Sequence, residues 1–334
     1  MPQEPLIVLE NRRGMRVFVD PMGASIRAVY VQDRRGEFKN VALCSLQQPS
    51  SADDSLYAGA TLAPIAGRVA KGRLTCGSQR YELTQNDGKH HLHGGYRSMS
   101  FVPWKTSPVI RTEEGSSLAL FAIAEDERDG YPGNREFKVT YTLDNENRIT
   151  IRYQIKTDRT TCVSVSNHTY WNLSGDFGRS ALLQELEIDA DSVYFNDDEH
   201  IALSRRSVKD SPFDFRSPSR IESKIAKAPE HPQLLIARGY NHAYVLNNNP
   251  SPVKLCDPLS GRRLSVYTDY PSCVFYSGGF IGSGIELLDH QHTSASCALA
   301  MEAQELPAGF FDHTLELHPG HTRERFICYA FDCC

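Results

Sequence analysis

Hydrophobic residues alternate with polar ones along most of this chain. In the clearest case Phe137, Val139, Tyr141 and Leu143 alternate with polar neighbours, and the polar run 144–147 then breaks the pattern. The alternation resumes over 149–155. Because successive side chains of a strand point to opposite faces, this pattern predicts two antiparallel strands joined by a tight loop.

Shorter alternating runs recur from one end of the chain to the other. Turn signals such as Asp87-Gly88, Pro132-Gly133, Ser260-Gly261 and Pro319-Gly320 separate them. The predicted strands cover residues 15–19, 118–123, 183–188, 264–267, 315–317 and 326–331. Helical periodicity is confined to one short stretch, 219–226, between Pro218 and Pro229. Many short strands with few helices predict an all-β fold, a sandwich or barrel.

The length of 334 residues alone would favour two domains, but the strand pattern continues without a linker. The polar segment 196–218 is the best linker candidate, yet it carries Phe213 and Phe215, which a passive linker does not need. We therefore expect residues 1–334 to form a single domain.

Composition narrows the function classes. The net charge is −5, from 36 basic and 41 acidic residues without a basic stripe, so we expect no nucleic-acid partner. No apolar run is long enough to span a membrane, and residues 1–5 do not resemble a secretory signal. The nine cysteines form no C-x-x-C pair, so we interpret them as free thiols, with Cys333-Cys334 as an exposed tail. A cytoplasmic protein is expected.

A histidine-rich segment, 89–95, contains His90, His91 and His93 followed by Gly94-Gly95. Three histidines within four positions could be metal ligands, and the glycines could let the backbone approach a ligand closely. A surface loop is the alternative. Because no further Cys, His or carboxylate stands at ligand spacing, we expect no metal, and His90 and His91 are taken as bystanders.

Two further segments combine polar and aromatic groups. Over 165–173, strand alternation places Asn167, Thr169 and Trp171 on one face and His168 and Tyr170 on the other. An apolar ring face with several polar edge groups is typical of a sugar site. The pair Asn241-His242 likewise opens an apolar strand, a weaker signal.

An acidic residue, Glu302, lies within the otherwise apolar run 299–303. Burying a carboxylate is costly unless it is paired or functional. Glu302 is therefore either an outward-facing residue of an edge strand, or a general base in a pocket where desolvation raises its pKa.

Taken together and in this order, these segments resemble the aldose 1-epimerase (galactose mutarotase) family over nearly the whole chain. The matching motifs are Gly14-Met15-Arg16-Val17, Gly23-Ala24-Ser25-Ile26, Gly59-Ala60-Thr61-Leu62, Gly67-Arg68-Val69, Leu92-His93-Gly94-Gly95, Asp129-Gly130-Tyr131-Pro132-Gly133-Asn134, Asn167-His168-Thr169-Tyr170-Trp171-Asn172-Leu173, Pro212-Phe213-Asp214-Phe215-Arg216, Phe275-Tyr276-Ser277-Gly278 and Met301-Glu302-Ala303-Gln304.

The resemblance implies one large antiparallel β-sandwich of the galactose mutarotase-like type, with a monosaccharide in an open cleft. It implies that Glu302 is the catalytic base, His168 the principal general acid and His93 the second histidine of the site. Arg68, Asn241 and Tyr276 are then expected to bind substrate. Neither metal nor cofactor is implied, and the protein is expected to be a monomer or homodimer.

The chain departs from the family pattern at two places. Asn241 stands where the family commonly has aspartate, which would turn a charge-assisted hydrogen bond to a sugar hydroxyl into a neutral one. Pro307-Ala308-Gly309-Phe310 replaces the family's usual run after the catalytic glutamate, so we expect a different cleft rim there.

Three alternatives stay open. A hexose-6-phosphate 1-epimerase would need a cationic cluster, for which Arg68, Arg97, Arg205 and Arg206 are candidates. A sugar-binding protein without activity would be expected to lack His168 or Glu302, and both are present. A glycoside hydrolase would need two flanking carboxylates and fits poorly.

Overall fold

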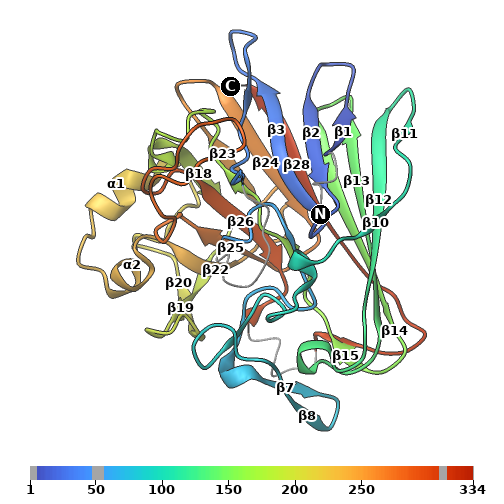
Figure 1. The fold of residues 1–334 in the computed structure, drawn as a ribbon. Coiled ribbons are helices and arrows are strands. Elements are labelled where there is room, and N and C mark those ends of the chain that lie inside the picture. The colour runs from blue at the N-terminus through green and yellow to red at the C-terminus, as the bar shows by residue number, and fades with distance from the viewer. Residues whose placement is uncertain (1–5, 47–55, 308–313, 334) are drawn as a thin grey trace.

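The structure, a computed structural model, describes residues 6–46, 56–307 and 314–333. Antiparallel sheets dominate it, which confirms the predicted all-β class (Figure 1). The largest sheet has ten strands: β10 (Lys105–Thr106), β11 (Ile110–Arg111), β12 (Gly115–Ala124), β13 (Arg135–Asp144), β14 (Arg148–Thr157), β28 (Arg323–Cys333), β24 (Arg262–Thr268), β23 (Val253–Cys256), β18 (Glu185–Ile188) and β21 (Ser219–Arg220).

A second sheet has six strands in the order β17 (Tyr170–Trp171), β26 (Leu299–Gln304), β25 (Ser272–Tyr276), β22 (Asn241–Val245), β19 (Ser192–Asn196) and β20 (Ala202–Ser207). A third, at the N-terminal end, has four strands: β1 (Ile7–Glu10), β2 (Arg16–Asp20), β3 (Ser25–Gln32) and β4 (Phe38–Asn40). Short two-stranded pairs complete the fold: β5 (Thr61–Leu62) with β16 (Ser166–Asn167), β6 (Arg68–Val69) with β9 (His91–Leu92), β7 (Arg73–Cys76) with β8 (Gln79–Glu82), and β15 (Thr161–Cys162) with β27 (Glu316–Leu317).

The hairpin predicted from the alternation forms as expected. β13 and β14 pair in register from Arg135↔Thr157 to Leu143↔Ile149. Asp144 closes the turn by accepting hydrogen bonds from the backbone N–H groups of Glu146 and Arg148. The odd-numbered residues of β13 are buried while the even ones keep some exposure, so the period-two pattern does reflect one buried face.

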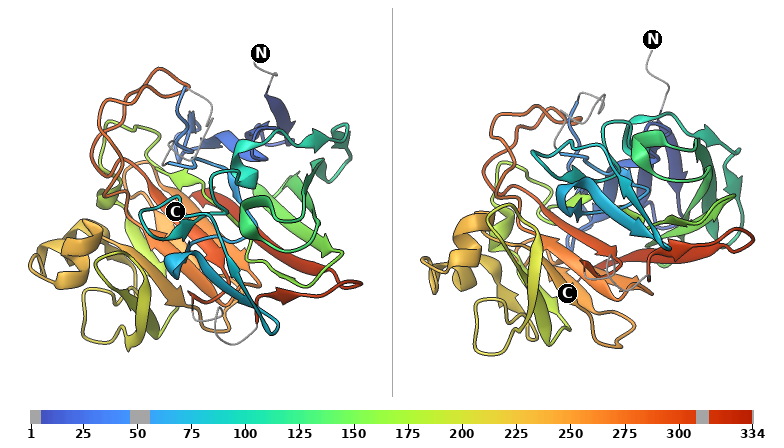
Figure 2. Two further views of the ribbon diagram at one scale, coloured as in Figure 1. Left: turned by 60° about the horizontal axis from the view of Figure 1, so that its bottom comes forward. Right: turned by 90° about the horizontal axis from the view of Figure 1, so that it is seen from below.

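Helices are few and short in the described residues. α1 (Ile221–Ala226) begins two residues later than predicted because 219–220 form β21, and α2 (Pro232–Ala237) was not predicted. Both helices lie at the edge of the molecule (Figures 1 and 2). Single 3₁₀ turns occur at Ala70–Gly72, Met99–Phe101, Arg128–Gly130 and Ala181–Leu183, the last where the strand 183–188 was predicted to begin. None of these helices is long and apolar enough to cross a membrane.

One hydrophobic core connects the sheets. Its buried members run from Leu9 to Phe331 and include Phe213 and Phe215 of the linker candidate. Chain segments from both ends and the middle therefore share a core, which supports the prediction of a single domain. The eight cysteines in the described residues form no disulfide with one another, and Cys334 lies outside those residues. Cys333 is exposed but belongs to β28, so it is not a loose tail.

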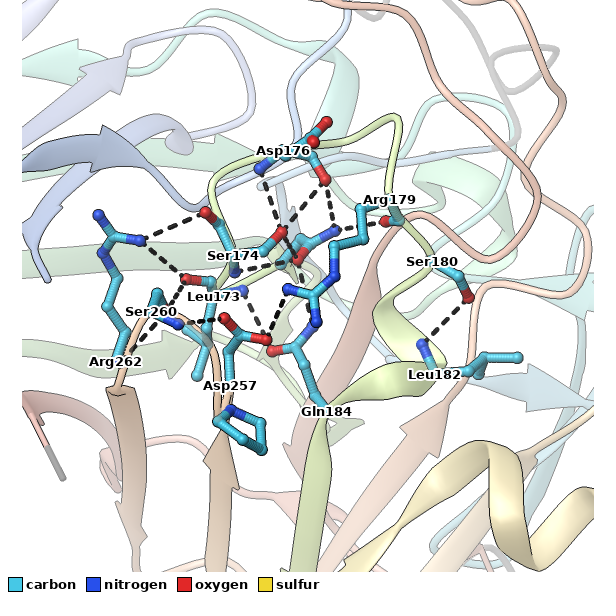
Figure 3. Close-up of polar contacts among 12 residues, drawn as sticks. Leu173, Ser174, Asp176, Arg179, Ser180, Leu182, Gln184, Asp257, Ser260 and Arg262 are labelled. Atoms are coloured by element: carbon cyan, nitrogen blue, oxygen red, sulfur yellow. Dashed lines mark hydrogen bonds and ion pairs between the residues drawn. The ribbon is translucent and has the colours of Figure 1, made fainter.

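A polar cluster fixes the chain just after β17. Arg262 donates to the carbonyl oxygens of Leu173 and Ser174, and the buried Asp257 pairs with Arg179 at 2.9 Å (Figure 3). Gln184 accepts a hydrogen bond from the N–H of Leu173. These bonds anchor the segment that leaves the six-stranded sheet beside the site described next.

Candidate active site

A cavity of about 400 Å³ opens on the six-stranded sheet. Strand alternation decides which residues reach it. In β26 Leu299, Met301 and Ala303 belong to the hydrophobic core, whereas Glu302 and Gln304 line the cavity. The neighbouring strands follow the same rule, so the floor of the cavity also includes Val274 and Tyr276 of β25, Asn241 and Ala243 of β22, Tyr170 of β17, Asn196 of β19 and Ala202 beside it on β20.

Glu302 lies inside the sheet rather than at its edge, because β26 pairs with both β17 and β25. The residue is only 4% exposed. Burial raises the pKa of its carboxyl to about 8, against a smaller lowering by the positive charge of Arg68. The expectation of a pocket-facing carboxyl with a raised pKa is therefore met, and the edge-strand alternative is wrong.

His168 lies between β16 and β17, with its Nε2 3.4 Å from Oε1 of Glu302. It shares the cavity with Tyr170, whereas the alternate residues Asn167 and Trp171 are fully buried and do not line it. The predicted division between the two faces therefore holds, although residues 168–169 interrupt the strand. Burial lowers the pKa of His168 to about 4, so the imidazole is neutral near pH 7.

His93 supplies the third polar group. Its ring stands edge to face with that of His168, with 5.4 Å between centroids. The backbone N–H of Gly67 donates to its Nδ1 at 3.1 Å. Burial lowers the pKa of His93, and the neighbouring His168 and Arg68 lower it further. Because Nδ1 accepts this hydrogen bond, it carries no proton of its own. The proton of the neutral ring is therefore on Nε2, which can donate a hydrogen bond.

The two glycines after His93 serve the protein rather than a ligand, contrary to expectation. Gly94 has φ +91°, and a Cβ there would lie 2.2 Å from the carbonyl oxygen of Ala63. A Cβ on Gly95 would lie 2.6 Å from Oδ1 of Asp129. Neither glycine lines the cavity. Both let the loop pack tightly enough to present His93.

His90 and His91 do not line the cavity, in agreement with their interpretation as bystanders. His91 is fully buried, with Nε2 2.7 Å from the hydroxyl of Tyr131 and Nδ1 2.7 Å from the carbonyl oxygen of Thr84. Tyr131 belongs to the motif 129–134, so that motif supports the His93 loop from behind.

Arg68 stands at the cavity wall on β6, beside β9 and His93. Its Nε is 2.6 Å from Oδ2 of Asp87, which also lines the cavity. Arg97, Arg205 and Arg206 do not line it. Of the four cationic candidates the structure therefore brings only Arg68 to the site, already paired with a carboxylate.

Asn241 and Tyr276 also reach the cavity. Asn241 begins β22, and among the described residues its side-chain amide has no partner. Tyr276 ends β25, and its hydroxyl accepts a hydrogen bond from the N–H of Phe280. Burial raises the pKa of Tyr276 to about 12, so the phenol stays protonated. All six predicted site residues thus line one cavity.

Several lining residues were not predicted. Gln304 could have been found from strand alternation, because it stands two positions after Glu302 on the same face. Asp87 was interpreted only as part of a turn, and His200 and Phe280 lie in loops without a recognisable pattern. The altered rim after Glu302 begins at Pro307, which lines the cavity, while 308–310 lie outside the described residues.

The structure assembles a possible ligand set that the sequence did not reveal. One ligand atom each from His93, His168 and Glu302 lies within 4.8 Å of the others. A divalent metal would need a lone pair on each imidazole. The Gly67 N–H already occupies Nδ1 of His93 and leaves the proton on Nε2. The hydrogen bonding of His93 therefore suits proton-donor chemistry better than metal binding.

Comparison with known proteins identifies the family to which this chain belongs. The sequence profile of the aldose 1-epimerase family matches residues 5–329. The chain belongs to the aldose 1-epimerase family.

Individual relatives of the family agree with this. The chain is 31% identical to galactose mutarotase of Mus musculus over 290 residues, which covers 85% of this chain and 81% of the mouse protein. It is 29% identical to aldose 1-epimerase of Escherichia coli K12 over 311 residues, which covers 90% of this chain and 86% of that protein. The crystal structure of an aldose epimerase homologue from C. elegans superimposes with a TM-score of 0.87, at 27% identity and with 98% of both chains covered. The predicted galactose mutarotase-like β-sandwich is thereby confirmed.

Proposed function

We propose that this protein is an aldose 1-epimerase, an isomerase that interconverts the α and β anomers of a free aldohexose such as galactose or glucose. One observation carries the proposal beyond family membership. A carboxyl with a raised pKa, a neutral imidazole 3.4 Å away and a second imidazole with a fixed N–H donor converge in one sugar-sized cavity.

The reaction needs one proton removed and one supplied. Near pH 7 Glu302 and His168 share one proton, and the reaction uses the form in which that proton has moved from the Glu302 carboxyl to His168. The ionised Glu302 then takes the proton of the anomeric hydroxyl while the protonated His168 gives its proton to the ring oxygen. The bond between C1 and the ring oxygen breaks and the C1 carbonyl forms, giving the open-chain aldehyde. Rotation about C1–C2 presents the other carbonyl face, and closure returns both protons. Each positioned acid or base typically contributes about 10² to 10⁴ in rate.

The other residues hold the sugar. The Nε2–H of His93 donates toward the ring oxygen, where negative charge develops on opening. Arg68 and Asn241 bind hydroxyl groups, and Tyr276 presents its protonated phenol at the floor. The neighbouring rings of His168, Tyr170 and Tyr276 restrict one another and keep the imidazole oriented.

A neutral sugar fits this cavity better than a sugar phosphate. A phosphate dianion calls for several arginine or lysine side chains around it. In the described residues Arg68 is the one such side chain that lines the cavity, and Asp87 already offsets its charge. The hexose-6-phosphate alternative is therefore disfavoured. The ordinary charge balance of the chain agrees, because a neutral substrate needs no steering field.

The decisive experiment follows the optical rotation of freshly dissolved α-D-galactose, α-D-glucose and glucose 6-phosphate. We expect catalysed mutarotation of the free sugars by the wild-type protein, and loss of that catalysis in Glu302→Gln, whose neutral amide cannot accept the proton. The circular dichroism spectrum checks that the variant is folded. Full activity in folded Glu302→Gln would refute the role of Glu302, and inactive wild-type protein would favour a sugar-binding role.

A further inference from the structure

His200 lines the cavity although no strand carries it there. It lies in the turn between β19 and β20, where the Asp197 side chain accepts hydrogen bonds from the N–H groups of Glu199 and Ile201. The backbone of His200 has φ +64°, a left-handed conformation that is uncommon for residues other than glycine, although histidine adopts it more readily than most. The turn therefore holds this side chain in one defined position at the cavity wall.

An ion-pair cluster fastens the same turn to the opposite loop. The carboxylate of Glu199 is 2.7 Å from Nζ of Lys89 and 3.4 Å from Nε2 of His90. Residues 89–90 immediately precede β9 and the His93 loop. The Glu199 cluster thus joins the loop that carries His200 to the loop that carries His93.

An aromatic residue, Phe280, supports the His200 ring from the side. The two rings meet edge to face with 5.5 Å between centroids, and the Arg238 guanidinium lies 4.9 Å from the centroid of Phe280. The N–H of Phe280 donates to the hydroxyl of Tyr276 on the cavity floor. Packing of this kind limits the rotation of the His200 side chain.

The imidazole of His200 nevertheless has unused hydrogen-bonding capacity. Among the described residues neither ring nitrogen has a hydrogen-bond partner, and Nδ1 is buried. Nε2 is therefore the atom left to meet a ligand. Burial and the charge of Arg68 lower the pKa of His200, so the ring near pH 7 is neutral and carries one N–H.

Arg68 lies close enough to both His200 and Glu302 to act on their charges. Its charge lowers the pKa of Glu302 and also that of His200, so Arg68 is within electrostatic range of both. Contacts separate His200 from the reacting groups. His93 and His168 meet ring to ring and His168 lies 3.4 Å from Glu302, whereas the ring of His200 meets that of Phe280. A sugar whose anomeric carbon meets Glu302, His93 and His168 therefore presents the far edge of its ring toward His200.

We propose that His200 is a substrate-binding residue that recognises the hydroxyl on C4, across the ring from the anomeric carbon, and so contributes to the choice among aldoses. This proposal rests on the function proposed above. The open amide of Asn241, on the same cavity, is the second group able to meet that edge. Galactose and glucose differ only in configuration at C4, so this contact discriminates between them.

The test compares kcat/KM of wild type and His200→Ala for α-D-galactose, α-D-glucose and 4-deoxy-D-glucose. Loss of one neutral hydrogen bond should lower kcat/KM for the sugar whose C4 hydroxyl meets the imidazole by about 3- to 10-fold, mainly through KM. The variant should leave 4-deoxy-D-glucose unchanged, and the galactose-to-glucose ratio should shift. If the deoxy sugar turns over too slowly, its inhibition constant serves instead.

Two further variants complete the design. His200→Asn keeps an N–H donor and tolerates positive φ, so it should recover part of the lost selectivity. His290→Ala removes another histidine at positive φ, 80% exposed and outside the cavity, and should change nothing. Equal effects of His200→Ala on all three sugars, or none on any, would overturn the proposal. Failure of wild type to act on any sugar would overturn the proposed function instead.

Discussion

Nε2 of His168 and Oε1 of Glu302 lie 3.4 Å apart, and less than a tenth of either side chain is exposed. Because the two groups are buried and close together, their protonation is coupled, and the state in which they share one proton is favoured over the states with two protons or none. With a pKa of about 4 for His168 and about 8 for Glu302, the pair carries one proton between those values.

The pH dependence of activity follows from this shared proton. Below pH about 4 both groups are protonated and no base is left, and above pH about 8 both are deprotonated and no acid is left. We expect kcat/KM to be flat between these limits and to fall on either side. The measurement is initial rates in a polarimeter, with the buffer-catalysed rate subtracted. Activity that keeps rising from pH 8 to pH 10 would contradict the pairing.

The same raised pKa predicts a cost in stability. The pKa of Glu302 is 4.5 in the unfolded chain and about 8 in the folded protein. The folded protein therefore binds this proton more tightly, which adds to the free energy of unfolding. That contribution is complete below pH 4.5 and is lost as the pH rises to 8. Glu302→Gln removes this loss. The variant should gain, relative to wild type, roughly a few kcal/mol between pH 4.5 and pH 9. Urea denaturation at both pH values measures the difference, and an equal offset at both would refute it.

His168→Asn should lower kcat far more than it changes KM, because proton transfer to the ring oxygen belongs to the transition state. The expected loss is about 10²-fold or more. Michaelis–Menten analysis with α-D-galactose measures both constants. The exposed His321→Asn is a suitable control. A change confined to KM would make His168 a binding residue only.

Asp87→Asn tests how the cavity treats charged sugars. The substitution removes the negative partner that lies 2.6 Å from Arg68 and leaves the guanidinium free to attract an anion. We expect the ratio of kcat/KM for glucose 6-phosphate to that for glucose to rise by about 2- to 5-fold at low salt. Added salt should reduce the gain. An unchanged ratio would show that Asp87 does not govern the charge preference.

Asp257→Ala tests the anchor behind the site. This carboxylate is fully buried, so its removal strands Arg179 and the N–H of Ser260, at a cost of about 2 to 4 kcal/mol in the free energy of unfolding. Asp332→Ala is a matched control, because its pair with Arg263 is exposed and contributes about 0 to 1 kcal/mol. Thermal or urea denaturation compares them. Equal costs would contradict the anchoring role.

The strands were predictable from the sequence because burial of one face imposes a period of two. The 137–155 hairpin follows from that rule, and so does the shared face of His168 and Tyr170. For Glu302 the pattern left two positions open, an exposed edge and a pocket, and only the structure decides between them. The helix α2 was missed because six residues are too few to show helical periodicity. The roles of His93 and Arg68 came from the family resemblance rather than from the pattern.

The remaining features depend on contacts between distant segments. No local signal relates Asp87 to Arg68 or carries His200 to the cavity. The hydrogen bond from Gly67 to His93 fixes a tautomer that only packing could reveal. Likewise, the convergence of three potential ligand atoms within 4.8 Å was invisible in a sequence where His93, His168 and Glu302 lie far apart.

The position of β26 between β17 and β25 has a kinetic consequence. Glu302 cannot meet His168 until β26, near the end of the chain, has inserted between two strands that come earlier in the sequence, β17 and β25. Contacts this remote in sequence form slowly, because long loops must close first. During refolding, enzymatic turnover should therefore return in the slowest phase, after most of the sheet signal. The return of enzymatic activity during refolding should therefore mark the point at which all strands of the sandwich have paired.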